Sequence, residues 1–188
     1  MSSLDSLTAK LKVSEEPGLE AFDDRFGAIG DHAQARRFDK ASELFEELVK
    51  EEIYDLRLLV YFLYQCVDSK GATGVLGMLQ VLNAVFEDNW EAWGPVNKRE
   101  KVLARSLGWL LDNLNDLATY HLESTDSTWS LFSERDEDQL DKLRDEFLKL
   151  GNHLSQPVWG TCKGQLTGLQ RILEDEFHLL DHVVVEEE

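Results

Sequence analysis

The chain has 188 residues, of which 43% are hydrophobic and 30% charged, and this balance is typical of a folded domain rather than of a disordered segment. Its formal net charge of −18 disfavours nucleic acid and anionic membranes as partners, because both would repel it. Its 2 cysteines cannot form a disulfide framework, and its longest strongly apolar run, 58–67, is too short to span a bilayer, which takes about 20 residues. We therefore expect a cytoplasmic protein without membrane insertion.

The first part of the chain predicts three amphipathic helices. Leucines at helical spacing indicate a short helix within residues 3–12, and Pro17-Gly18 breaks the chain after it. A second helix is expected over 19–34. Asp39 is typical of an N-cap, which predicts a third helix over 40–52 with its glutamates facing water. The side chains expected on the buried faces of these two helices are Phe22, Phe26, Ile29, Ala41, Leu44, Phe45 and Leu48.

The most apolar part of the chain lies between residues 53 and 95. It holds two dense apolar runs, joined by the connection 68–73. Each run is long enough for a buried helix, and the short connection suits an antiparallel helix pair. We predict one helix over about 55–68 and a second that is capped by Thr73 and ends near residue 89. The first of these helices is apolar almost all round, so it should be central, with the rest of the chain packed around the hairpin.

The remainder of the chain predicts three longer helices. Leucines spaced three and four apart indicate a helix over 97–121, and a segment rich in Ser, Thr and Asp, 123–135, indicates a loop or linker. Further helices are expected over 136–150, with Gly151 just beyond its end, and over 157–182. No stretch alternates like a strand. The sequence thus predicts an all-α fold, an antiparallel multi-helix bundle of about seven to eight helices around the central hairpin.

The charge distribution is consistent with a division of the chain into parts. The net charge is −6 for residues 1–52, −2 for 53–121 and −10 for 122–188, so the segment expected to form the core is nearly neutral. The expected parts are a helical domain (1–121), a loop or linker (122–135), two further helices packed on or appended to that domain (136–182), and an acidic tail (183–188).

One group of residues has the spacing of a metal site. Glu174, His178 and His182 follow one another at intervals of four on the last predicted helix, so two histidines and a carboxylate could share an ion. The glutamate does not lie between the histidines, however, as it does in HExxH metalloproteases. We favour the alternative, two histidines near a helix C-terminus where positive charge is favourable, and we expect no metal and no cofactor.

Candidate protein-contact residues lie outside the apolar centre. Trp129 and Trp159 stand in less regular sequence than the other tryptophans and could belong to a contact surface. Asp136, Glu137 and Asp138 begin a predicted helix, where acidic side chains either complement the helix dipole or meet a partner. The sequence has no phosphate-binding loop, nucleophile elbow or calcium loop, so we expect no enzymatic activity.

Several segments together form a familiar pattern. They are Pro17-Gly18, Tyr54-Asp55-Leu56-Arg57 before an apolar helix, a turn with Gly71 and Gly74, Trp90 followed by Pro95, and Leu107-Gly108-Trp109. Over about residues 15–118, this pattern resembles the ImpA-type N-terminal domain of TssA-like proteins from bacterial type VI secretion. Where that family has Ser-Lys before Asp-Leu-Arg, this chain has Ile53-Tyr54, and residues 122–188 match nothing in the pattern.

The resemblance implies a non-enzymatic, cytoplasmic assembly factor of bacteria. TssA-like proteins contact the sheath, baseplate or membrane complex of the secretion apparatus, and the C-terminal regions of that family generally form rings, so a homo-oligomer stays open. Two alternatives remain at this point. One is a metal-dependent helical enzyme that uses Glu174, His178 and His182, and the other is an unrelated helical adaptor protein.

Overall fold

The computed structural model describes residues 3–124 and 129–183, and the side chains up to residue 180. Within these residues the fold is all α, with eight α-helices, two 3-10 turns and no strand, which confirms the predicted class. The elements are α1 (Ser3–Thr8), α2 (Asp24–Gln34), α3 (Phe38–Lys50), α4 (Leu56–Lys70), α5 (Ala72–Glu87), η1 (Trp90–Ala92), α6 (Arg99–Glu123), α7 (Glu137–His153), η2 (Pro157–Trp159) and α8 (Gly160–Val183).

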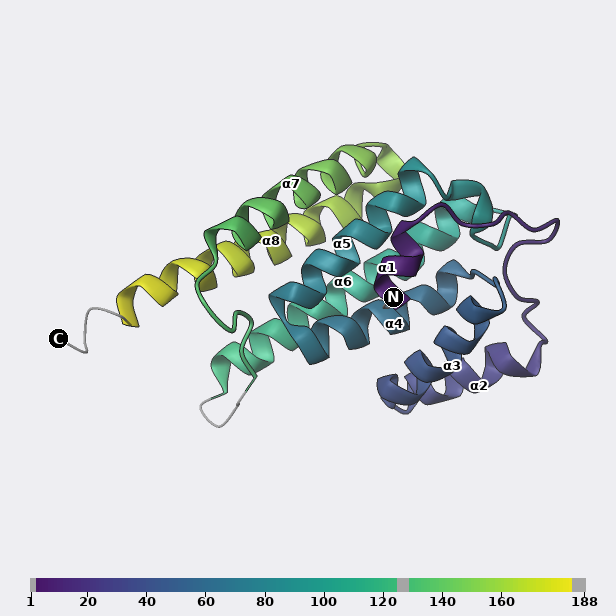
Figure 1. Cartoon of the computed structure of the whole chain (residues 1–188), viewed down its shortest axis with the longest axis horizontal. Helices are drawn as coiled ribbons and strands as arrows, with labels where there is room; N and C mark the ends of the chain where they lie inside the picture. The colour runs from purple at the N-terminus through teal and green to yellow at the C-terminus, as the bar shows by residue number, and fades with distance from the viewer. Residues whose placement is uncertain (1–2, 125–128, 184–188) are drawn as a thin grey trace.

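The hairpin of α4 and α5 lies in the middle of the molecule (Figure 1). Helix α4 packs against α3, α5 and α6, while α5 packs against α1, α4 and α7. Because each of the two helices has neighbours on several sides, most of its residues are buried, including the polar Asn83. The apolar runs of the sequence therefore form the core.

The turn between these two helices is tighter than the sequence indicated. Gly71, with a φ of 56°, is at once the C-cap of α4 and the N-cap of α5. Thr73 was expected at that cap, but it lies inside α5 and accepts a hydrogen bond from Gln139 Nε2 at 2.9 Å. A Cβ on Gly74 would lie 2.2 Å from the carbonyl oxygen of Cys66. Only glycine leaves room for the two helices at this crossing.

The last two helices lie along the central hairpin and α6. Helix α7 packs on α5, and α8 packs on α6 and α7. The described part of the connection between α6 and α7 packs against the helices, because Leu131 and Phe132 are each only 5% exposed. The backbone N–H of Ala72 also donates to the Leu131 carbonyl at 2.7 Å. This segment therefore covers the α4–α5 turn, although the sequence predicted a loop or linker there.

Two predicted helix ends differ from the structure because of contacts between helices. Asp39 was expected to cap α3, but the helix begins at Phe38, whose buried ring lies 4.5 Å from the ring of Tyr64. Gly151 was expected beyond the end of α7, yet the helix continues to His153, which stacks on Phe86 with 5.0 Å between ring centroids. In both cases the helix includes an aromatic residue that contacts another helix, and it therefore extends beyond the end predicted from the cap residue.

Candidate functional site

Three segments of the family-like pattern meet at one junction. A Cβ on Gly94 would lie 1.9 Å from the Pro17 carbonyl oxygen, and one on Gly18 would lie 3.0 Å from the Gly94 Cα. The Gly94 N–H donates to the Tyr54 carbonyl at 3.0 Å, and the Leu56 N–H donates to the Gly94 carbonyl at 2.9 Å. Three stretches far apart in sequence thus cross without space for side chains.

Asp55 is the centre of this junction and is 1% exposed. As the N-cap of α4, it accepts hydrogen bonds from the Arg57 N–H at 3.0 Å and from the Arg57 guanidinium at 2.7 Å. It also accepts from the Leu19 N–H at 2.9 Å, and Arg57 in turn donates to the Leu19 carbonyl at 2.7 Å. The guanidinium lies over the ring of Phe26, 4.3 Å from its centroid. The pair therefore joins the segment before α2 to the start of α4, which is a structural role.

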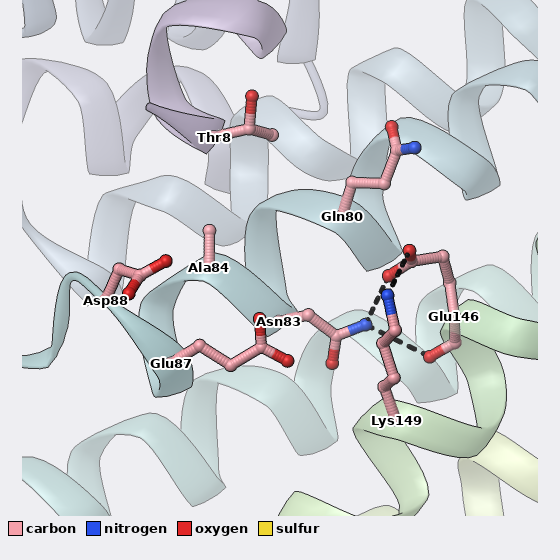
Figure 2. Close-up of a pocket in the computed structure, with 8 residues that line it drawn as sticks. All are labelled: Thr8, Gln80, Asn83, Ala84, Glu87, Asp88, Glu146 and Lys149. Atoms are coloured by element: carbon pink, nitrogen blue, oxygen red, sulfur yellow. Dashed lines mark hydrogen bonds and ion pairs between the residues drawn. The ribbon is translucent and has the colours of Figure 1, made fainter. Parts of the chain in front are cut away.

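A polar hollow of about 270 Å³ lies between α1, α5 and α7 and is shown in Figure 2. Asn83, 2% exposed, points from α5 toward α7 and donates to the carboxylate of Glu146 at 2.6 Å and to its carbonyl at 3.1 Å. Lys149 also donates to the Glu146 carboxylate, at 3.1 Å. The residues that line the hollow are Thr8, Gln80, Asn83, Ala84, Glu87, Asp88, Glu146 and Lys149.

The chemistry of this hollow is that of a polar contact surface. The only hydroxyl in its lining is that of Thr8, which donates to the Asp5 carbonyl at 2.9 Å instead of to a base. The hydrogen bond with Glu146 raises the pKa of Lys149, so this amine stays protonated at neutral pH. The carboxylates of the hollow can accept hydrogen bonds from the cationic groups of a partner, but its lining has no activated nucleophile.

Neither cysteine is set up as a nucleophile. Cys66 and Cys162 are both free and buried. Burial raises the pKa of the Cys66 thiol to about 11, and it raises the pKa of Cys162 as well. Since the thiolate is the reactive form, both side chains behave as small hydrophobic groups at neutral pH.

The two candidate contact tryptophans occupy different environments. Trp159 is 2% exposed and packs edge-on against Phe86, 5.4 Å between ring centroids, so its ring belongs to the core and is not on a surface. Trp129 is half-buried, stacks on His121 at 4.7 Å and donates from Nε1 to the Asp68 carbonyl at 2.9 Å. Only Trp129 retains surface that a partner could contact.

The acidic residues at the start of α7 are exposed. Asp136 caps the helix by accepting from the Gln139 N–H at 3.2 Å. Glu137 pairs with Arg135, and Asp138 pairs with Lys142 at 2.9 Å. The three residues stabilise the helix N-terminus, and their role in partner contact stays a prediction.

The candidate metal ligands are only partly brought together. Glu174 is held by Arg144 through two hydrogen bonds of 2.7 Å, and the first of its neighbouring histidines, His178, lies 3.8 Å from its carboxylate. The side chain of His182 lies outside the described residues. Among the side chains that the structure describes, no group of three or more His, Cys, Asp or Glu is arranged to hold a metal ion.

Sequence reasoning missed two surface features. Asn83 lies in the most apolar helix. An amide side chain in such a helix could have indicated the polar hollow. Phe22 and Leu44 were assigned to buried helix faces, but they are 86% and 37% exposed. Leu44 lines an apolar groove between α2 and α3, which the amphipathic pattern alone could not reveal.

The fold and these surfaces define an all-α protein in which three of the pattern's segments meet at a buried junction. The model of the family described as ImpA, N-terminal, type VI secretion system, matches residues 5–112, which extend from α1 into α6. The chain therefore belongs to this family of the type VI secretion system. No curated protein and no solved structure matches it. Among the described helices, none has the length and apolar character needed to cross a membrane.

Proposed function

We propose that this protein is a non-catalytic docking module of a bacterial type VI secretion apparatus. It binds a component of the sheath, the baseplate or the membrane complex, and it does so in the cytoplasm. The observation that carries the proposal is the family match over residues 5–112, together with the use of the signature residues in the buried junction. Because the matched residues at this junction are buried, contacts with a partner would use other, exposed residues.

The charge of the chain supports a docking role. The formal net charge is −18, and the segment 122–188, which lies outside the family match, has −10 of it. Exposed acidic side chains such as Glu137 and Asp138 favour a basic or mixed partner surface. Such charges mainly set the association rate and the choice of partner.

The test is binding of the purified full chain to purified sheath, baseplate and membrane-complex components, measured by biolayer interferometry at two salt concentrations. We expect one component to bind, with a slower association at the higher salt, because salt screens exposed charges. A Glu137→Lys/Asp138→Lys variant reports whether the start of α7 takes part. If none of the three classes of component binds, the proposal is wrong.

A further inference from the structure

An apolar groove of about 260 Å³ lies between α2 and the C-terminal half of α3. Ala28, Leu44 and Leu48 form its apolar surface. Three acidic side chains also line it, namely Asp24, Glu47 and Glu51, and Glu47 is paired with Lys50 at 2.7 Å. The groove therefore combines apolar and acidic side chains.

The other helices that the structure describes do not cover this groove. The main contacts of α2 are with α3 and α4, and Figure 1 shows the α2–α3 pair at the edge of the molecule, apart from α7 and α8. Leu44 is 37% exposed, and Phe22, just before the start of α2, is 86% exposed. An exposed leucine in an apolar hollow that none of the described helices covers favours contact with another molecule.

The charge around the groove selects the kind of partner. Arg25 is the one cationic side chain in the lining, and it is paired with Asp23 at 3.0 Å and with Glu51 at 2.9 Å. Between residues 20 and 52 the sequence has ten acidic and five basic side chains. A second copy of this chain, with its own net charge of −18, would be repelled, and so would the terminal residues 186–188, which are all glutamate.

We propose that the α2–α3 groove binds a basic amphipathic helix of a partner protein. Two packed helices leave a groove into which a third can lay its apolar face, with anchors three and four residues apart. Its lysines or arginines would then meet Asp24, Glu47 and Glu51. This inference rests on the proposed docking function and names the class of partner that the module binds.

The experiment uses the full chain and three synthetic helical peptides. The peptides share one leucine face and have Lys, Gln or Glu at all polar positions, and binding is measured by fluorescence anisotropy at two salt concentrations. We expect the Lys peptide to bind tightest, the Glu peptide not to bind, and Leu44→Glu to weaken the Lys peptide at least about tenfold. Leu148→Glu is the matched control, since Leu148 is a 65% exposed leucine on α7, and it should bind like the wild type.

A second variant guards against a folding defect in the first. Glu47→Lys changes a side chain that is 64% exposed, so it should keep the fold by circular dichroism and still weaken the Lys peptide several-fold. The inference is overturned if both groove variants bind the Lys peptide as tightly as the wild type. It is also overturned if the wild type self-associates in analytical ultracentrifugation and Leu44→Glu abolishes this, because a second copy would then occupy the groove.

Failure of this inference can be told apart from failure of the proposed function. If a secretion component binds the wild type and Leu44→Glu equally well, the docking function stands and the groove is not its site. If no component binds while the Lys peptide still binds in the groove, the proposed secretion role is wrong, and the groove is still a binding site for basic helices.

Discussion

Replacement of Asp55 by alanine tests the junction as the element that fixes the path of the chain. The side chain is 1% exposed and accepts hydrogen bonds from two backbone N–H groups and from the Arg57 guanidinium. In Asp55→Ala the N-terminus of α4 loses its cap, the buried Leu19 N–H loses its acceptor, and the guanidinium loses its counter-charge. Each loss has a separate cost.

The size of the effect follows from these contacts. A lost N-cap costs about 1 kcal/mol, and an unsatisfied buried N–H costs about 1–3 kcal/mol. Arg57 remains 26% exposed and is partly solvated, so the loss of its counter-charge adds only a modest amount to the destabilisation. The expected loss is about 3–5 kcal/mol, which matches the range for breaking a buried ion pair. For a chain of this size, that lowers Tm by roughly 10–15 °C.

The chain contains its own control for this measurement. Asp23 caps α2 with the same Asp-x-Arg arrangement, accepting from the Arg25 N–H at 2.9 Å and from its guanidinium at 3.0 Å, but on the surface. Asp23→Ala should therefore lower Tm far less than Asp55→Ala in thermal unfolding followed by circular dichroism. Asp55→Asn should fall between the two, because the amide oxygen still caps the helix. Equal losses in the two alanine variants would refute the argument that burial, and not local capping, gives Asp55 its importance.

Three further predictions concern two glycines, one ion pair and one buried thiol. Gly94→Ala would place its Cβ 1.9 Å from a backbone carbonyl and should cost about 3 kcal/mol in urea unfolding, whereas Gly151→Ala, in open space within α7, should stabilise by about 0.5–1 kcal/mol. The Arg144 guanidinium lowers the pKa of Glu174, so this pair stabilises the fold above the ordinary carboxyl pKa of 4.5 and ceases to do so as the pH falls through the lowered value. Glu174→Gln should thus lower Tm by about 1–3 °C at neutral pH and by progressively less as the pH falls through the lowered pKa of Glu174. Burial raises the pKa of Cys66 to about 11, so mass spectrometry should find it alkylated by iodoacetamide only after denaturation.

The central hairpin could be predicted because its signal is local. A helix buried on all sides needs an almost continuous apolar run, and α4 and α5 have such runs on either side of a glycine turn. The first of them was predicted from about residue 55, and it begins at Leu56 with Asp55 as its cap. The glycine and aspartate pattern then indicated the family, which the match over residues 5–112 confirms.

The surface could not be predicted in the same way, because it depends on what packs above each side chain. Leu44 has the spacing of a buried residue on α3, yet no helix covers it and it is 37% exposed. Trp159 lies two residues after a proline in irregular sequence, yet it is 2% exposed because it packs against Phe86 on α5. Helical periodicity identifies the apolar face of a helix, but it does not show whether a neighbour is present to bury that face.

The two Asp-x-Arg caps of this molecule differ in what contacts them. Asp23 and Asp55 make the same local hydrogen bonds, so the three-residue pattern alone does not distinguish them. Leu19 and Phe26 pack over the second pair, which turns a helix cap into a junction that the fold requires. A residue held by such a junction cannot change to suit a partner without loss of stability. The exposed residues of the α2–α3 groove have no such constraint, so Leu44→Glu and Glu47→Lys should change binding while lowering Tm far less than Asp55→Ala does.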